Sequence, residues 1–489
     1  MSGVFGVVGK NDCRRDLFYG TDYHSHLGTE YGGMAVLGET FTRQIHNISQ
    51  SQFKSKFYED SKHMEGNKGI GVISAHDEQP IYLNSKFGPF CLVMEGMIEN
   101  IEELARDMMK RGASFSEVSK GHINSAELVA KLIVEGDDIV DGIEKMHKII
   151  EGSCSLLVLN KDGVYAARDR YGYTPLAIGK RSDAWAVASE TSAFPNNDFE
   201  TVKYLSPGEI VLLNETGIVQ KNPGNSTNQI CAFLWIYTGF PASSYEGVNV
   251  EMVRERSGRL LAKHDKDIDV DVVAGVPDSG VGHAIGYAME SGKPYRRPLV
   301  KYTPGYGRSY TPPSQEKRDF IAKMKLIPVK EIIKNKKIVV CDDSIVRGTQ
   351  LKNFAIKKLW NAGAKEIHAR PACPPLMFPC KFNLSTRSIK ELAARKAIHS
   401  IEGHDIEDVA EYVDNKSAKY KKMVDWIAKD IEVTTLRYQT VDDMVEAIGL
   451  PKEKLCLYCW TGNCPHDKKS CMKNNETKGE EKWQKALHT

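Results

Sequence analysis

The feature that most constrains this chain is a strand–loop–helix unit that begins at Lys337. Four apolar residues follow Lys337 and predict a strand buried on both faces, which ends at Asp342 and Asp343. A short loop ending in Gly-Thr comes next, and residues 350–362 have the composition of a helix. The N–H groups of such a loop and the dipole of the helix can together hold a phosphate group. Carboxylates at the end of a parallel strand suit vicinal hydroxyls or a hydrated Mg²⁺.

Residues 342–349, with the sequence Asp-Asp-Ser-Ile-Val-Arg-Gly-Thr, resemble the 5-phosphoribosyl-1-pyrophosphate (PRPP) loop of type I phosphoribosyltransferases, in the version found in the glutamine PRPP amidotransferase family. An aspartate pair by itself is as often a solvated turn, but the length of the whole run argues against that alternative. The resemblance implies that Asp342 and Asp343 hold the ribose hydroxyls of PRPP. It also implies that the rest of the loop holds the 5-phosphate, through Ser344, Val346, Arg347, Gly348 and Thr349.

The second half of the chain alternates strands and helices at a spacing that predicts an α/β domain with a parallel sheet. The expected elements are a strand over 269–276, a helix over 281–291, and strands over 298–302 and 366–371. This is the fold that the resemblance to type I phosphoribosyltransferases also implies.

The segment Pro-Asp-Ser-Gly at 277–280 ends the first of these strands. Taken alone it is only a good turn sequence, but at this distance before the PRPP loop it resembles the family's pyrophosphate loop. The resemblance implies that Ser279 meets pyrophosphate or its metal ion. The Mg²⁺ ligands would then be Ser279, Asp342 and Asp343.

The basic segment 301–326 lies between the two loops and resembles a lid that closes over PRPP in the family. The resemblance implies that Lys301 and Arg308 stabilise the departing pyrophosphate, which suits their charge because the leaving group is an anion. A solvated basic loop is the alternative. This segment has one extra residue around 304–306 and a proline at Pro312, which puts its geometry at variance with the family's.

Composition limits the classes of function. The 489 residues suffice for two to four domains, and 66 basic against 64 acidic side chains leave a net charge of +2. This balance gives no electrostatic footprint for nucleic acid or for an anionic membrane. The sequence also lacks an apolar run of about 18 residues and a secretory leader, so we expect a cytoplasmic protein with no membrane span.

The first half of the chain predicts an α+β sandwich of about 230 residues, because runs of short strands surround two helices. The expected strands are 2–9, 69–73, 90–94, 155–159 and 163–167, and the expected helices are 100–112 and 125–135. Several segments resemble the N-terminal-nucleophile (Ntn) glutaminase domain of the same family, a class II glutamine amidotransferase. They are residues 3–7, 26–28, 78–80, 167–172 and 188–191.

The resemblance fails at the positions that carry the family's glutaminase chemistry. Ser2 stands where the family has its nucleophilic cysteine, although a terminal serine can also act as a nucleophile. Glu95 replaces the asparagine of the oxyanion hole, and an acid there opposes a developing negative charge. The family's arginine falls near Ser74, and its aspartate becomes Ser125 or Ala126, so both charged ends of glutamine lose their partners. We therefore expect an inactive glutaminase site.

Four of the eleven cysteines crowd into residues 456–471, which in a cytosolic chain favours metal over disulfides. Some members of the family carry a [4Fe–4S] cluster, and the resemblance implies ligation by four cysteines. They are Cys231, Cys380, Cys456 and Cys459. The alternative is a local Zn²⁺ site, in which the last two join Cys464, His466 and Cys471.

These observations predict a glutaminase-like domain over 2–230, a phosphoribosyltransferase domain over 231–465, and a polar tail over 466–489. The resemblance implies transfer of an amino group to C1 of PRPP, giving 5-phosphoribosylamine and pyrophosphate in purine synthesis. With a degraded glutaminase site, ammonia would arrive free or from a separate donor, and the chain would form a homo-oligomer, a dimer or a tetramer. Two alternatives remain: another amine as the acceptor, or a non-catalytic sensor of PRPP or nucleotides.

Overall fold

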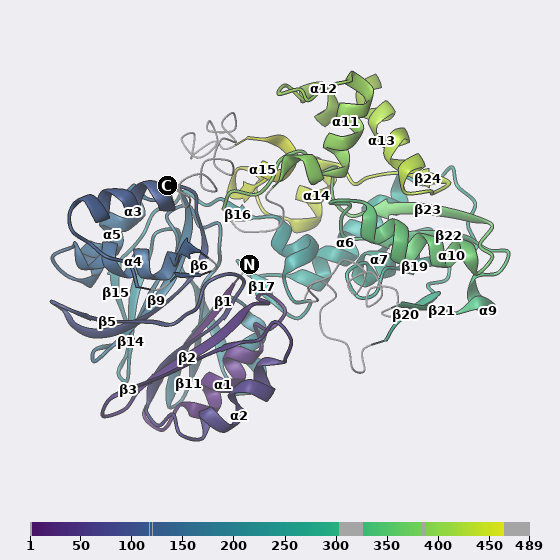
Figure 1. Cartoon of the computed structure of the whole chain (residues 1–489). Helices are drawn as coiled ribbons and strands as arrows, with labels where there is room; N and C mark the ends of the chain where they lie inside the picture. Colours follow the sequence, from purple (N-terminus) through teal and green to yellow (C-terminus); the bar gives the residue numbers. More distant parts are fainter. Residues whose placement is uncertain (1, 117, 120, 303–325, 383–387, 464–489) are drawn as a thin grey trace.

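The computed structural model describes residues 2–116, 118–119, 121–302, 326–382 and 388–463 (Figure 1). Arg308, most of the expected lid, and the alternative zinc ligands Cys464, His466 and Cys471 lie outside the described residues. None of the helices in the described part of the chain has the length and apolar character of a membrane span.

Two antiparallel sheets stack face to face in the first part of the chain. One has the strand order β13-β11-β12-β1-β4-β2-β3 and the other the order β15-β14-β10-β9-β6-β5. The strands of the first are β1 Gly3–Gly9, β2 Tyr31–Leu37, β3 Phe41–Asn47, β4 Lys68–Ser74, β11 Ala177–Arg181, β12 Ala184–Ala188 and β13 Glu200–Tyr204. Those of the second are β5 Ile81–Ser85, β6 Gly88–Ile98, β9 Gly152–Asn160, β10 Gly163–Ala167, β14 Ile210–Asn214 and β15 Gly217–Asn222.

Helices cover the outer face of each sheet, so the first part has four layers (Figure 1). The helices are α1 Arg14–Asp22, α2 Phe53–Ser61, α3 Ile101–Lys110, α4 Ser125–Val134 and α5 Ile139–Ile149. Alternate residues of the central strands, such as Val4, Val72 and Leu157, fill the space between the sheets. The other residues of these strands face the helices, which explains why all nine residues of β9 are buried. A short hairpin of β7 Val118–Ser119 and β8 His122–Ile123 precedes α4.

A parallel sheet of the order β19-β22-β23-β24 forms the centre of the second part. Its strands are β19 Val272–Gly275, β22 Lys337–Asp342, β23 Glu366–Pro371 and β24 Thr435–Leu436. The helices are α6 Val250–Lys263, α7 Val281–Ser291, α9 Lys330–Ile333, α10 Lys357–Asn361, α11 Ala393–Glu402, α12 Ala410–Val413, α13 Ala418–Asp430, α14 Val441–Ile448 and α15 Tyr458–Thr461. The predicted α/β architecture is present, and β24 is a strand that the sequence pattern did not indicate.

Three sequence expectations for this part need correction. The strand expected over 298–302 is β20 Leu299–Lys301, which pairs antiparallel with β21 Leu326–Pro328 and lies outside the parallel sheet among the described residues. Only Leu299 of β20 is buried, so this strand forms the edge of a separate ribbon. The first expected strand begins three residues late, because Asp271 uses its carboxylate to accept a hydrogen bond from Lys337 N. The helix after the PRPP-like loop begins as a π-helix, η4 Leu351–Ile356, before α10.

Residues 230–250 connect the sandwich to the part that contains the parallel sheet. β16 Ile230–Cys231 pairs in parallel with β25 Leu455–Cys456 near the other end of the described chain. The π-helical segment η3 Leu234–Thr238 and the hairpin of β17 Ser244–Tyr245 and β18 Val248–Asn249 follow β16. Residues 230–250 therefore lie between the sandwich and the parallel sheet (Figure 1).

Candidate functional sites

The carboxyl edge of the parallel sheet brings together two loops that are far apart in sequence. β19 and β22 are neighbours, so the loop after β19 lies beside the aspartates that end β22. Ser279 Oγ donates a hydrogen bond of 2.8 Å to Asp342 Oδ1, and Asp343 N donates one of 3.0 Å to the same oxygen. Three of the residues singled out in the sequence thus form one site.

Asp342 and Asp343 are both buried, 9% and 6% exposed. Burial raises the pKa of both carboxyls, and the charge of Asp343 raises the pKa of Asp342 further. The hydroxyl of Ser344 opposes this effect by donating to Asp343. A cation relieves the repulsion between two adjacent buried carboxylates, and oxygen donors of this kind are the ligands of Mg²⁺.

The donor set therefore fits Mg²⁺, which binds through one or two carboxylates while keeping water or substrate oxygens as its other ligands. Among the described residues no group of three or more His, Cys, Asp or Glu side chains is arranged to hold an ion by itself. An ion at Asp342 and Asp343 would accordingly need oxygens from water, Ser279 or a phosphate.

The loop after Asp343 is held by backbone contacts. Ala393 N donates to Val346 O at 2.7 Å, and Lys352 N donates to Gly348 O at 2.9 Å. Gly348 has φ +77°, in the left-handed region that favours glycine. Arg347, which the resemblance assigns to the 5-phosphate, instead donates to Glu391 Oε2 at 2.5 Å in this ligand-free structure.

The pyrophosphate-like loop packs tightly against the end of β22. A Cβ on Gly280 would lie 2.1 Å from Cys341 O, so only glycine fits there. The peptide bond between Pro277 and Asp278 is cis. Lys301 Nζ donates to Asp278 Oδ2 at 2.8 Å, which places this lysine at the loop.

The four cysteines expected to bind a cluster come together from three segments. Cys231 and Cys456 are paired in the β16–β25 ladder. The carbonyl of Cys459 accepts hydrogen bonds from the N–H groups of Met377 and Phe378, which fixes it next to the segment of Cys380. Aromatic rings of both parts of the chain surround them, with Tyr173 stacked on Phe382 at 3.9 Å between ring centroids.

The electrostatics of the thiols also show that the four cysteines are neighbours. Burial and then the charge of Cys380 raise the pKa of Cys231 to about 12. The pKa of Cys459 is also held well above its ordinary value. The largest cause is its hydrogen bond with Cys380, followed by burial and then by the charges of the other three cysteines. A metal centre replaces the thiol protons, and four thiolates are the ligand set of a cubane cluster. By chemical type the four thiols match a [4Fe–4S] cluster, although among the described residues they are not arranged as a group that could already hold a metal.

In the sandwich, the positions of the family's glutaminase chemistry have other contacts. Ser2 Oγ accepts a hydrogen bond of 3.2 Å from Ala75 N. Ser74 Oγ accepts hydrogen bonds from the N–H groups of the turn that follows, including one of 3.1 Å from Asp77. Asp77 in turn accepts a hydrogen bond of 3.1 Å from Ser125 N. Hydrogen bonds thus join Ser74, Asp77 and Ser125 to one another.

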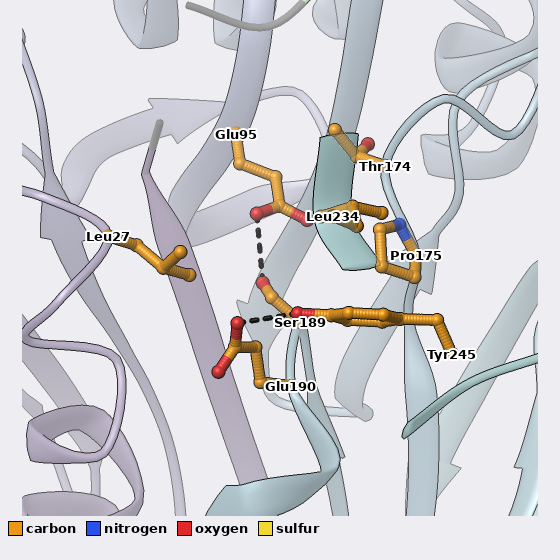
Figure 2. A pocket seen from close by; sticks show the side chains of 8 residues that line it. All are labelled: Leu27, Glu95, Thr174, Pro175, Ser189, Glu190, Leu234 and Tyr245. Atoms are coloured by element: carbon orange, nitrogen blue, oxygen red, sulfur yellow. Dashed lines mark hydrogen bonds between the residues drawn. The ribbon is translucent and has the colours of Figure 1, made fainter. Parts of the chain in front are cut away.

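A small pocket lies next to Glu95, lined by Leu27, Glu95, Thr174, Pro175, Ser189, Glu190, Leu234 and Tyr245 (Figure 2). Glu95 is 4% exposed, and its Oε2 accepts a hydrogen bond of 2.9 Å from Ser189 Oγ. Burial raises the pKa of Glu95 to about 8, and the charges of Asp169 and Glu190 add to this effect. Glu95 is therefore largely protonated at neutral pH.

Glu190, the other acid of this pocket, is fully paired. Its carboxylate accepts from Tyr245 OH at 2.5 Å and from Ser243 Oγ at 3.1 Å, and it lies 3.0 Å from His26 Nε2. Burial by itself raises the pKa of Glu190, but His26 and Tyr245 outweigh burial and hold this pKa below its ordinary value. Because Tyr245 and Ser243 belong to residues 230–250, Glu190 ties the sandwich to the connecting segment.

Arg254 lies between this pocket and the aspartates of the parallel sheet. Its guanidinium is buried and donates to the carbonyls of Trp235, Tyr237 and Gly239 at 2.9–3.0 Å. Burial lowers the pKa of Arg254, and the charge of Asp343 opposes this effect. This arginine thus holds the connecting segment and shares the electrostatic field of the PRPP-like loop.

Sequence reasoning missed Ser189, Glu190, Tyr245 and Arg254 as site residues. The first two lie in the segment 188–191 that resembles the family, which is the one signal that pointed to them. Tyr245 is 55 residues from Glu190 in sequence and carries no local motif.

The chain was compared with known proteins. A family model described as a glutamine amidotransferase domain matches residues 68–196. The chain is 30% identical to an amidophosphoribosyltransferase of Methanocaldococcus jannaschii over 95% of this chain and 98% of that protein. It is also 30% identical to an amidophosphoribosyltransferase of Bacillus subtilis, over 95% of this chain and 94% of that protein.

Two solved structures resemble the structure of this chain over nearly the whole length of both proteins. The glutamine PRPP amidotransferase of B. subtilis, complexed with ADP and GMP, has a TM-score of 0.81 at 28% identity and covers 95% of this chain and 97% of its own. A structure described as the allosteric regulatory enzyme of purine biosynthesis has the same TM-score at 29% identity, with 95% and 96% covered. The fold predicted from the sequence, an Ntn sandwich followed by a type I phosphoribosyltransferase domain, is confirmed.

Proposed function

Because this chain belongs to the amidophosphoribosyltransferase family, we propose that it transfers an amino group from ammonia to C1 of PRPP in purine nucleotide synthesis. The nitrogen of ammonia forms a bond to C1 while the bond from C1 to pyrophosphate breaks, giving 5-phosphoribosylamine. The observation that carries the proposal is the hydrogen bond of 2.8 Å between Ser279 and Asp342, which joins the two PRPP loops at the carboxyl edge of one parallel sheet.

Each side chain has a proposed role. Asp342 and Asp343 bind the ribose hydroxyls and, with Ser279, Mg²⁺, which would neutralise charge on the pyrophosphate. The 5-phosphate is held by the loop over 344–349, through Ser344, Val346, Arg347, Gly348 and Thr349. Arg347 exchanges its contact with Glu391 for the phosphate.

Pyrophosphate is stabilised from the other side of the site. Lys301 moves from Asp278, an exposed ion pair of little net strength, to the departing anion. Arg308 has the same proposed role from the lid. Both cations lower the energy of the transition state because negative charge grows on the leaving group.

Ammonia, and not glutamine, is the proposed amino donor. Neither Ser74 nor Ser125 carries a charge that could bind an end of glutamine, and the hydroxyl of Ser74 already accepts hydrogen bonds from its own turn. Ser2 is accordingly proposed to be a vestige of the nucleophile. Free ammonia or a separate ammonia-producing protein would then supply the nitrogen.

We also propose a [4Fe–4S] cluster on Cys231, Cys380, Cys456 and Cys459. Its four thiolate ligands come from both ends of the second part of the chain, so the cluster would act as a structural crosslink. The four-cysteine arrangement favours the cluster over the zinc alternative, which leaves two of these cysteines unused. A homo-oligomer in the cytoplasm, as in the sequence analysis, completes the proposal.

The deciding experiment measures pyrophosphate release from Mg-PRPP by anaerobically purified protein, with ammonium chloride and with glutamine in parallel. Release with ammonium alone is expected. Release with glutamine at a comparable rate would contradict the inactive glutaminase site. No release with either donor, with a melting temperature that PRPP still raises, would contradict the transferase and favour a PRPP sensor.

A further inference from the structure

One oxygen of a buried acid in the sandwich lacks a hydrogen-bond partner. Glu95 Oε2 accepts from Ser189, but Glu95 Oε1 is buried and has no partner among the described residues. Figure 2 shows that this second oxygen turns away from Ser189, toward the side of the pocket lined by Leu234 and Thr174. Buried polar atoms are paired in the great majority of cases, so an unpaired oxygen facing a pocket points to a ligand with a hydrogen-bond donor.

The pocket around this oxygen is small and combines acidic and apolar groups. Leu27, Pro175 and Leu234 form its apolar walls. The polar groups are oxygens, from Glu95, Thr174, Ser189, Glu190 and Tyr245. Oxygen acceptors on an apolar wall suit a small ligand that consists of N–H donors.

The charges that face Glu95 are mostly negative. The charges of Asp169 and Glu190 both raise its pKa. Arg254 lies beyond Tyr245 and is tied to three carbonyls. His24 adds no positive charge at neutral pH, because burial lowers its pKa to about 4.

The two neighbouring acids already have partners, which leaves Glu95 as the available one. Asp169 accepts hydrogen bonds from the backbone N–H groups of Tyr171, Tyr173 and Thr174. Glu190 is bound by His26 and Tyr245. A cation that enters the pocket therefore meets one unpaired acceptor, Glu95 Oε1.

We propose that this pocket binds ammonium and that Glu95 Oε1 accepts a proton from it, releasing ammonia for the transferase. The inference rests on the proposed use of ammonia and names the site that supplies it. The N–H bond breaks with its electron pair left on nitrogen, and the proton forms an O–H bond with the Glu95 carboxylate. Glu95 returns this proton to water before the next turnover, so charge and atoms balance.

The presence of Glu95 in place of the family's asparagine explains why this pocket would bind ammonium. An asparagine at this position offers an N–H donor, whereas the ionised form of Glu95 offers only acceptors. The exchange thus converts a site for an anion into a site for a cation. A pKa of about 8 also allows Glu95 to lose and regain a proton near neutral pH, as a general base must.

The first test measures binding without catalysis. Ammonium chloride is expected to raise the melting temperature of the wild type more than potassium chloride at equal ionic strength. The difference should vanish in Glu95→Gln and persist in Glu200→Gln, a matched change of an exposed glutamate on β13. Equal effects of potassium and ammonium, or an ammonium effect that survives in Glu95→Gln, would overturn the proposal. The comparison of the two salts on wild type needs no variant to fold.

The second test follows pyrophosphate release against pH and ammonium concentration. For the wild type, kcat/KM for total ammonia should rise with pH and level off above about pH 8, where Glu95 is ionised. In Glu95→Gln it should continue to rise, because only free ammonia reacts, and KM near neutral pH should be about tenfold higher.

The two proposals fail in different ways. Normal release by Glu95→Gln with the wild-type KM and pH profile would reject the ammonium site and leave the transferase intact. No release by the wild type would reject the transferase, and the salt comparison would still decide whether the pocket binds ammonium.

Discussion

Two pairs of buried carboxyls occupy the two parts of this molecule, and they differ in how they are paired. Asp342 and Asp343 are adjacent in sequence, and burial raises the pKa of both. Glu95 and Glu190 are 95 residues apart and meet at one pocket. There the pKa values move in opposite directions, up for Glu95 and down for Glu190.

The difference shows what each pair is suited to do. Two adjacent acids of raised pKa, which accept hydrogen bonds from hydroxyl and N–H donors, are suited to a divalent cation. At the second pair, Tyr245 donates a hydrogen bond to Glu190 and His26 lies 3.0 Å from it, whereas Glu95 keeps one oxygen without a partner among the described residues. The first pair therefore suits the proposed transferase site, and in the second pair Glu190 supports Glu95, the proposed proton acceptor.

The largest effect is expected for the first pair. Asp343→Asn should lower the rate of pyrophosphate release at least about 100-fold, because an amide cannot replace the charge that binds Mg²⁺. The melting temperature should not fall, since the change removes repulsion between neighbouring carboxylates. Asp425→Asn, an exposed change on α13, is the control and should keep wild-type activity. Activity of Asp343→Asn within a few-fold of the wild type would contradict the proposed role.

The second prediction concerns the four cysteines proposed to bind the cluster. Cys380→Ser should lower the iron content from about four atoms per chain to nearly none, because a cubane needs all four thiolates. The variant should also be cleaved faster by protease, since three separate segments lose their crosslink. Cys91→Ala, a buried cysteine between the two sheets, is the control. Unchanged iron in Cys380→Ser, measured by metal analysis, would reject this ligand set.

Removing the charge of Glu190, the structural acid of the second pair, should lower the stability of the protein. Glu190→Gln is expected to lower the free energy of unfolding by about 2 kcal/mol, because a buried carboxylate that accepts hydrogen bonds from Tyr245 and Ser243 is lost. The folded pKa of Glu190 is below its ordinary value, so its stabilising effect is present above that value and lost as pH falls. The stability of Glu190→Gln in denaturant titrations should accordingly depend less on acid pH. A variant as stable as the wild type would show that Glu190 is not the tie between the parts.

The reactive acid, Glu95, should show the opposite sign. Burial raises the folded pKa of Glu95 from 4.5 to about 8, so its ionisation disfavours folding and wild-type stability falls as pH rises across this range. Glu95→Gln should therefore be more stable than the wild type by about 2 kcal/mol near pH 6 and by more above pH 8. Below about pH 5 the two proteins should unfold alike. If Glu95→Gln is the less stable protein at high pH, Glu95 is an ordinary paired carboxylate.

Most of the secondary structure near the sites could be predicted from local patterns. The apolar run before Asp342 and the Gly-Thr that follows specify a strand, a loop and a helix without reference to other residues. The ribbon of β20 and β21 could not be predicted in this way. A three-residue strand has too little pattern to indicate its partner, and pairing with residues far along the chain decided it.

The sequence by itself determined the transferase loop, because adjacent residues need only one strand and one turn to reach their positions. It also determined that Ser2, Ser74 and Glu95 stand where the resemblance expects glutaminase residues. Only the tertiary structure decided that Glu95 meets Ser189 and Glu190, and that Tyr245 closes the same pocket. Those contacts join separate strands and a connecting segment, and the protonation of Glu95 depends on the burial that they produce together.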